Sequence, residues 1–529
     1  MESRVLIPRP LLFWAGVLVC SAGVGEHVVM FVDSASMNYH MAHMPMGASM
    51  WLAMAAIVAG LVMAGGGLVP RRLPAAIVPA PEEPEPEPVS EARRALARRR
   101  LVAVLSFALV VDQMKPATLA FMLPGARAEY GLTAAEVAWL PMGGLTGTVA
   151  GSLLWGHLAD RIGRRAAVLL AALLFVATTV CGAMPSFEAS VLMCLLMGMS
   201  AGGMLPIVYA LMSEVLPGRS GVMVLQAGLT TVGGYLAASG LAAVFEPIAG
   251  WRILWFVQLP LALALLALNR WIPESPAFLA SRGRLAEARR MSRLFGLSTT
   301  PRAAVPARRQ GPGALFGRDY LTQTLIICGY GLAWGVIYWG FLTFLPSLLG
   351  KAGVGAKPPQ ILFVSSLLSI PGTAVGAWLY SRWSSRRTMA LYGAVTAVSL
   401  LALLVIPLRS APAVVLVLMG LLTGASGVVA VMGPYAAQTY PTAFRGMGSG
   451  LAAACGKSGG MFGPPLIAWM TSFMSISRVA AVVAVPMALA AAAVATRGRE
   501  TVTAVRGADG AGREDGGRKV EEPGGAVIP

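Results

Sequence analysis

Residues 156–165 read Gly-His-Leu-Ala-Asp-Arg-Ile-Gly-Arg-Arg. They lie between two apolar runs, residues 137–155 and 166–184, and each run is close to the roughly 20 residues that an α-helix needs to cross a bilayer. A charged side chain in the hydrocarbon interior is costly, so a short loop with one aspartate and three arginines belongs at a membrane surface. The stretch therefore predicts two membrane-spanning helices joined by a turn at one face of the bilayer.

The composition of the whole chain is that of a protein with many such helices. Of its 529 residues, 56% are hydrophobic and only 12% are charged, which favours a polytopic membrane protein over several soluble domains. The net charge of +17 could indicate a nucleic-acid partner, but the arginines fall in short connections rather than on one amphipathic face. We interpret the basic charge as a topology signal and expect the lipid bilayer, not a nucleic acid, as partner.

Nothing in the sequence indicates catalysis or a bound cofactor. No Gly-rich phosphate loop, nucleophile elbow or pair of catalytic carboxylates occurs in a soluble segment. The cysteines all lie within predicted spans without paired spacing, which suggests neither a disulfide framework nor a zinc site: Cys20, Cys181, Cys194, Cys328 and Cys455. We therefore expect no enzyme activity, no cofactor and no ATP hydrolysis.

The order of apolar and polar stretches predicts an all-α polytopic membrane protein with about fourteen spans. Apolar runs of bilayer length form the helices, and Pro/Glu-rich or charged stretches connect them. The expected segments are a helical hairpin with a His/Met-rich external turn (1–70), a Pro/Glu- and Arg-rich cytoplasmic linker (71–100), a six-helix bundle (101–272), a central cytoplasmic loop (273–319), a second six-helix bundle (320–496) and a disordered cytoplasmic tail (497–529).

The basic residues predict the orientation of these spans. If the spans alternate, most Lys and Arg residues fall on one side, and positively charged loops stay in the cytoplasm. We therefore expect a multi-pass protein of the plasma (inner) membrane with both termini in the cytoplasm. The first apolar run, about residues 9–25, could also be a signal peptide. We favour an uncleaved helix, because no clear cleavage site precedes a soluble domain and a second apolar run follows almost at once.

The loop at residues 156–165 is named the opening loop here. It has a degraded copy about 220 residues later, Gly-Ala-Trp-Leu-Tyr-Ser-Arg-Trp-Ser-Ser-Arg-Arg at residues 376–387. Residues 217–221, Pro-Gly-Arg-Ser-Gly, similarly pair with residues 440–446, Tyr-Pro-Thr-Ala-Phe-Arg-Gly. A repeat of this kind is typical of secondary transporters, in which the substrate binds between the two repeats near the midplane. The two six-helix groups are thus expected to be related by duplication.

The pattern G-x-L-A-D-R-x-G-R-R resembles the loop between helices 2 and 3 of the major facilitator superfamily of secondary transporters. Further motifs are similar to its sugar-porter and metabolite:proton symporter branches: Gly250-Trp251-Arg252, Pro273-Glu274-Ser275-Pro276-Ala277-Phe278-Leu279, Gly202-Gly203-Met204-Leu205-Pro206, Ser213-Glu214, and Tyr440-Pro441-Thr442 with Arg445-Gly446. The resemblance covers about residues 101–496 and implies the major facilitator fold of six plus six pseudo-symmetric helices, preceded here by the extra hairpin.

By this resemblance, the opening loop latches the cytoplasmic ends of the two halves in the outward-facing state. The glycines permit a tight turn and close helix approach, and the aspartate can pair with arginine or cap a helix. The same arginines also serve as topology markers. The residues to which we assign this gating role are Gly156, Asp160, Arg161, Gly163, Arg164 and Arg165.

Two departures from the family pattern lie in the first half. Aromatic-acid symporters of the family carry a D-G-[FY]-D type motif in helix 1, where this chain has Asp112-Gln113-Met114-Lys115. The second acid is thus replaced by a lysine. In helix 4 those families have an arginine where this chain has Cys194, so a coupling role assigned to that arginine does not carry over.

Three ionisable residues of the predicted spans are candidates for substrate binding or proton coupling. Asp112 and Lys115 are three residues apart, so on a helix they share a face and can pair. Intramembrane charges are functional suspects by default, although a structural ion pair is the alternative. Lys457 lies where related transporters often have an arginine; it could attract an anionic substrate or extend to an interface.

The external turn of the hairpin is unusually rich in histidine and methionine. Thioether and imidazole groups together suit copper better than a hard cation, so His40, Met41, His43 and Met44 could hold a soft metal. Methionine is also a common filler of helix surfaces, and a short turn of this composition need bind nothing.

We expect alternating-access secondary transport of a small polar or organic-anion metabolite, as proton-coupled symport through Asp112. Residues 230–235 lack the Pro-containing glycine motif of drug:proton antiporters, which favours uptake. Soft-metal (copper) transport, drug efflux and a non-transporting membrane sensor are the alternatives.

Overall fold

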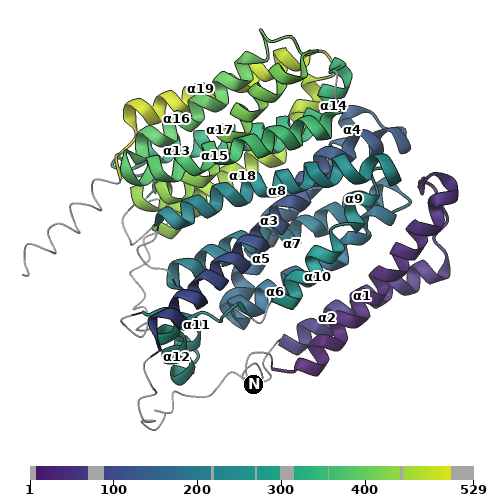
Figure 1. The fold of residues 1–529 in the computed structure, drawn as a ribbon, viewed down its shortest axis with the longest axis vertical. Helices are drawn as coiled ribbons and strands as arrows, with labels where there is room; N and C mark the ends of the chain where they lie inside the picture. The colour runs from purple at the N-terminus through teal and green to yellow at the C-terminus, as the bar shows by residue number, and fades with distance from the viewer. Residues whose placement is uncertain are drawn as a thin grey trace, which may run out of the picture.

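The computed structural model describes residues 8–68, 89–215, 220–268, 271–297, 315–354, 357–440 and 445–501. Within these ranges every regular element is a helix, so the all-α prediction is confirmed. The helices form three groups that lie side by side (Figure 1). They are the hairpin, an N-terminal half from Glu91 to Leu268 and a C-terminal half from Leu321 to Arg497.

The hairpin consists of α1 (Pro10–Asp33), the 3₁₀ turn η1 (Ser34–Met37) and α2 (Ala48–Leu68). Small residues let the two helices approach closely: a Cβ added at Gly16 would lie 2.5 Å from the backbone nitrogen of Ala64. The hairpin packs against α6 (Arg164–Ala177) and the 3₁₀ turn η2 (Thr178–Ala183) of the N-terminal half. In Figure 1 it lies on the side of that half that faces away from the C-terminal half.

The N-terminal half begins earlier than the sequence suggested. Helix α3 (Glu91–Glu129) starts within the expected linker, because Glu-Ala-Arg-Arg-Ala-Leu-Ala-Arg-Arg-Arg at 91–100 contains only residues compatible with a helix. Nε of Arg98 donates to the carbonyl of Phe295 in the central segment at 3.0 Å, which fixes this first part of α3. The helix also continues through Pro124.

The other elements of this half and of the central segment follow in chain order: α4 (Ala134–Val137), α5 (Trp139–Ile162), α6 (Arg164–Ala177), the 3₁₀ extension η2 (Thr178–Ala183), α7 (Phe187–Val215), α8 (Ser220–Ala249), α9 (Ile253–Phe256), α10 (Leu259–Leu268), α11 (Pro276–Ser281) and α12 (Leu285–Phe295). The C-terminal half contains α13 (Leu321–Gly335), the π-helical η5 (Val336–Phe341), α14 (Leu342–Ala352), α15 (Pro358–Arg382), α16 (Ser385–Ala402), α17 (Ala411–Thr439), α18 (Arg445–Met470) and α19 (Ile476–Arg497).

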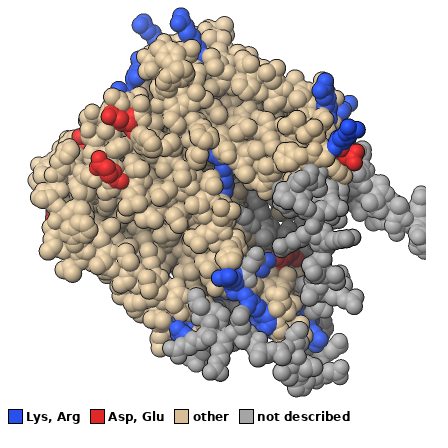
Figure 2. Space-filling model, turned by 180° about the vertical axis from the view of Figure 1, so that it is seen from behind, with Lys and Arg blue, Asp and Glu red and all other residues tan. Residues whose placement is uncertain are grey.

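Among the described residues, eleven helices are long and apolar enough to cross a membrane. The sequence predicted about fourteen spans. The three further ones correspond to the shorter apolar stretch Ile253–Leu268, to α16 and to α18. In Figure 2 most charged atoms of the visible face gather toward two opposite sides, with a broad band of other residues between them.

The two halves meet along several helix pairs, which create the space for a site between them. Helix α8 packs along α15 and α17, α5 packs against α18, and α3 contacts α14. We name the two ends of the bundle by one residue each. The Arg164 end holds the α5–α6 turn and α12, and the Glu129 end holds the end of α3, α9 and the hairpin turn.

Candidate functional site

Asp112 lies in the middle of α3 and is 3% exposed. Within the described part of the chain its carboxylate makes no hydrogen bond, but it interacts electrostatically with Lys457 and Lys115. The proline at position 116 has no N–H to offer the carbonyl of Asp112, so the backbone here is also free of its usual helical bond. A buried acid without a protein hydrogen-bond partner is available to a proton or a ligand.

Lys115 points away from this acid. Its Nζ donates to the carbonyl of Phe175 and to Oγ1 of Thr178, both at 2.5 Å, and lies 3.7 Å from the centroid of the Phe175 ring. Lys115 is fully buried inside the N-terminal half. No N–O distance within 4.0 Å joins it to Asp112 among the described ion pairs, so the direct pair that their spacing allowed does not form. The carbonyl and hydroxyl of α6 and η2 satisfy the ammonium instead.

Two cysteines lie beside Lys115. The Sγ atoms of Cys181 in η2 and Cys194 in α7 are 4.0 Å apart, and both residues interact electrostatically with Lys115. The sequence showed no pairing between them, because thirteen residues and a turn separate the two positions. The two departures from the family pattern, Lys115 and Cys194, are therefore neighbours.

Lys457 connects the two halves. It extends from α18 to α5, where its Nζ contacts Oγ of Ser152 and lies 3.4 Å from the carbonyl of Thr148. Lys457 also interacts electrostatically with Asp112. A base of the C-terminal half and an acid of the N-terminal half are therefore neighbours across the interface. The sequence singled out both ends of this pair, but not the α5 hydroxyl that Lys457 contacts.

Aromatic side chains from both halves surround this region. Trp334 packs against Gly456, the neighbour of Lys457, and its ring stacks on Tyr338 at a centroid distance of 5.1 Å. Tyr235 in α8 of the other half interacts electrostatically with Tyr338, and its hydroxyl donates to the carbonyl of Leu342 at 3.5 Å. Flat apolar surfaces beside a lysine suit a ring-bearing anion.

The opening loop is built around a carboxylate. Gly163, at the turn between α5 and α6, has φ +107° and ψ 155°, a conformation that favours glycine, and a Cβ there would overlap the carboxylate of Glu274. That carboxylate accepts the amide N–H of Arg164 at 2.8 Å and of Arg165 at 3.5 Å, which caps the N-terminus of α6. Burial raises the pKa of Glu274, and these amide hydrogen bonds counter the rise in part.

The other described contacts of this loop lie within the N-terminal half and the central segment. Nη2 of Arg164 is 3.5 Å from Oε1 of Glu214 in α7, and the carbonyl of Arg161 accepts Nη2 of Arg282 at 2.5 Å. Gly156 has open space at its Cβ position. The side chain of Asp160 lies outside the described part, and the latch between the two halves stays a prediction.

The degraded copy of the opening loop, at residues 376–387, is also built around a carboxylate. Glu500 accepts the amide N–H of Ser385 at 2.9 Å and the hydroxyls of Ser384 and Ser385, so it caps α16 as Glu274 caps α6. The amide of Thr501 donates to Oγ of Ser385 at 2.9 Å. Residues 498–501 therefore pack on the bundle, and the expected disordered tail begins too early at 497. Sequence reasoning missed Glu500, although Glu-Thr at 500–501 repeats Glu-Ser at 274–275.

The hairpin turn is attached to the bundle through Glu129, at the end of α3. Oε1 of Glu129 accepts the amides of Met41 at 2.9 Å and Ala42 at 3.0 Å. Nη2 of Arg252 lies 2.8 Å from the same oxygen, and Nε1 of Trp251 donates to the other oxygen at 2.8 Å. The Gly-Trp-Arg motif was visible in the sequence, but no pattern indicated a role for Glu129. This residue lies 123 positions before its partner Arg252.

This arrangement does not support a soft-metal site in the turn. Met41 is 1% exposed and packs with Phe31 and Phe256, and Met44 packs against the same cluster. His40 and His43 are exposed. Within the described ranges no group of three or more His, Cys, Asp or Glu residues could hold a metal ion. The methionines serve packing instead.

The fold and the charged site between its halves define a multi-pass membrane transporter rather than an enzyme. The family model of the Major Facilitator Superfamily matches residues 105–433, and the chain belongs to this family.

Similar proteins include a niacin transporter of Acinetobacter baylyi (strain ATCC 33305 / BD413 / ADP1), 27% identical over 70% of this chain and 86% of the relative. A gallate transporter of Pseudomonas putida is 28% identical over 69% of this chain and 83% of the relative. Among solved structures, the proton:xylose symporter XylE bound to 6-bromo-6-deoxy-D-glucose has a TM-score of 0.60 at 17% identity. It covers 78% of this chain and 99% of its own, and it confirms the predicted fold.

Proposed function

We propose that this protein transports a small aromatic carboxylate by alternating access, in symport with a proton. The observation that carries the proposal is that the side chain of Lys457 extends from α18 to α5. It lies beside Asp112, whose carboxylate makes no hydrogen bond within the described part of the chain. The relatives that act on niacin and gallate support an aromatic acid as substrate. The neighbouring aromatic groups Trp334 and Tyr338 fit the ring of such a molecule.

The coupling follows from the charges. While Asp112 is ionised, it attracts the ammonium of Lys457, which is held at Ser152 of the opposite half. When a proton binds the carboxylate of Asp112, this attraction ends and Lys457 becomes free to bind the carboxylate of the substrate. Proton and anion then enter the site together. The charge of Lys457 is balanced by Asp112 in the empty carrier and by the substrate in the loaded one.

We propose further that the Arg164 end faces the cytoplasm. The basic start of α3 and the arginines of α12 lie at this end, as positively charged segments do on the cytoplasmic side. The Glu129 end would then face the outside. Labelling of single cysteines placed in the α5–α6 turn and in the hairpin turn, in intact cells, tests this orientation.

The central experiment is uptake into proteoliposomes with an imposed pH gradient. We expect uptake of nicotinate or gallate to be driven by an inward proton gradient and uptake of the neutral analogue nicotinamide to be absent. Asp112→Asn should remove the stimulation by the gradient, and Lys457→Ala should raise KM about tenfold or more, whereas Lys457→Arg should retain uptake. Equal uptake of nicotinate and nicotinamide would contradict the anion site. No flux of any tested compound would favour a sensor.

A further inference from the structure

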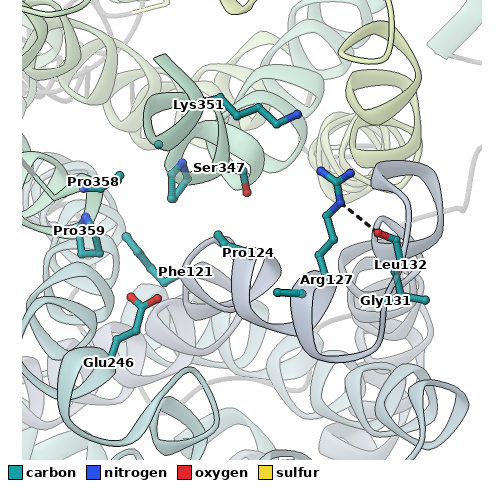
Figure 3. Close-up of a pocket in the computed structure, with 13 residues that line it drawn as sticks. Phe121, Pro124, Arg127, Gly131, Leu132, Glu246, Ser347, Lys351, Pro358 and Pro359 are labelled. Carbon is teal, nitrogen blue, oxygen red and sulfur yellow. Dashed lines mark hydrogen bonds between the residues drawn. The ribbon is translucent and has the colours of Figure 1, made fainter. Parts of the chain in front are cut away.

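A cavity lies between the two halves at the Glu129 end. Its volume is about 670 Å³, and α3 and α8 form one wall while α14 and α15 form the other (Figure 3). Along α3, the lining residues Phe121 and Arg127 are nine and fifteen residues from Asp112, which corresponds to about 13 and 22 Å at 1.5 Å per residue. The cavity therefore lies between the level of Asp112 and the Glu129 end.

Two cations project into this cavity from opposite halves. Nε of Arg127 donates to the carbonyl of Leu132 at 3.1 Å, which holds the guanidinium in place. Among the described residues, neither its terminal amino groups nor the ammonium of Lys351 has a hydrogen-bond or carboxylate partner. In Figure 3 the two cationic groups point toward the same side of the cavity.

A single acid lies on the other side. Glu246 of α8 lines the cavity, and its carboxylate makes no hydrogen bond within the described part of the chain. Its electrostatic neighbour is Lys357, which precedes α15. Phe121 lies between Glu246 and the two cations in Figure 3, and the rest of the lining is mainly apolar, with prolines from α3, α14 and α15.

We infer that this cavity is a capture site for aromatic monocarboxylates, distinct from the site at Lys457. The carboxylate binds between Arg127 and Lys351, and the ring lies against Phe121. A second carboxylate at the far end of the ligand would approach Glu246 and be repelled, so the site selects monocarboxylates over dicarboxylates. The two cations come from different halves, so a bound carboxylate also offsets their mutual repulsion as the halves close. This inference rests on the proposed function, that the substrate is an organic anion.

The test measures initial uptake of nicotinate in right-side-out membrane vesicles, where substrate enters at the Glu129 end under the proposed orientation. We expect the double variant Arg127→Gln/Lys351→Gln to raise KM about tenfold and to leave kcat within about twofold, because steering charges act before the transport step. Higher ionic strength should raise KM of the natural protein and change it little in the double variant. Arg409→Gln is the matched control, an exposed arginine at the same end that does not line the cavity.

A second variant tests the selectivity. Glu246→Gln should admit an aromatic dicarboxylate with carboxylates at opposite ends of the ring, measured as at least about threefold stronger inhibition of nicotinate uptake by terephthalate. An unchanged KM in the double variant, or an equal rise in Arg409→Gln, would overturn the capture site while the proposed function stands. A fall in kcat at constant KM would assign the two cations to gating and overturn it as well. If the natural protein takes up no monocarboxylate, the proposed function fails, and the capture site fails with it.

Discussion

The carboxylate of Glu129 is expected to hold the hairpin turn and the end of the N-terminal half together. It receives hydrogen bonds from Arg252, Trp251 and the amides of Met41 and Ala42, and the side chain of Arg252 is only 1% exposed. Glu129→Ala leaves that guanidinium buried with neutral acceptors alone, and loss of one partner of a buried ion pair costs about 3–5 kcal/mol. For a chain of 529 residues, 1 kcal/mol corresponds to about 1 °C, so the midpoint of thermal unfolding should fall by about 3–5 °C.

The measurement is the thermal unfolding midpoint of the purified protein in detergent, followed by tryptophan fluorescence. Glu129→Gln keeps the shape and one acceptor oxygen, so about half of the loss is expected. Glu188→Ala is the control, because Glu188 is an exposed carboxylate at the same end. The freed turn should also be cleaved faster by a protease at residues 38–44 in Glu129→Ala. Midpoints and cleavage rates equal to those of the control would refute the role of this network.

The remaining predictions concern the capped turns before α6 and α16, and the two buried residues that depart from the family pattern, Lys115 and Cys194. Gly163→Ala should lose most transport through about 1–3 kcal/mol of backbone strain at positive φ, whereas Gly329→Ala should transport normally because its Cβ has open space; equal uptake by both variants would contradict this. Glu500→Ala should lower the unfolding midpoint by about 1–2 °C through loss of the α16 cap, which contributes about 1–2 kcal/mol, and Glu500→Gln should lower it less. Lys115→Asp and Cys194→Arg should each reduce the amount of folded protein recovered from membranes, and the double variant should recover part of it; a double variant no better than the worse single one would show that the two positions do not interact.

Much of the fold could be predicted from the sequence because local patterns determine it. Apolar runs of bilayer length gave the order of the helices, and the loop at residues 156–165 identified the turn that Gly163 makes. The start of α3 was placed too late, at about residue 101, because the basic run before it was assigned to the linker. A run of arginines in a helix-compatible stretch is helical when another element packs on it, as α12 does here.

The partners of the charged groups could not be predicted in the same way. Glu129 meets Met41 and Arg252, which are 88 and 123 positions away, and Glu500 meets Ser385 at a separation of 115. No periodicity or spacing encodes such contacts. The repeat offered one usable signal, since Glu274 and Glu500 lie at matching places after the last helix of each half. Lys115 shows the opposite case: its three-residue spacing from Asp112 was compatible with a pair, but the carbonyl of Phe175 provided a nearer partner.

The replacements at Lys115 and Cys194, which interact electrostatically, leave Asp112 as the remaining acid of the helix 1 motif. By resemblance, related symporters carry an acid at the first of these positions and an arginine at the second, so one negative and one positive charge lie there. In this chain Lys115 stands in place of the acid and Cys194 in place of the arginine. The ammonium of Lys115 donates to a backbone carbonyl and a hydroxyl rather than to a carboxylate. The helix 1 motif therefore retains one acid instead of two. If transport is coupled to protons through this motif, Asp112 has to carry the proton alone, and its charge has to be balanced across the interface by Lys457.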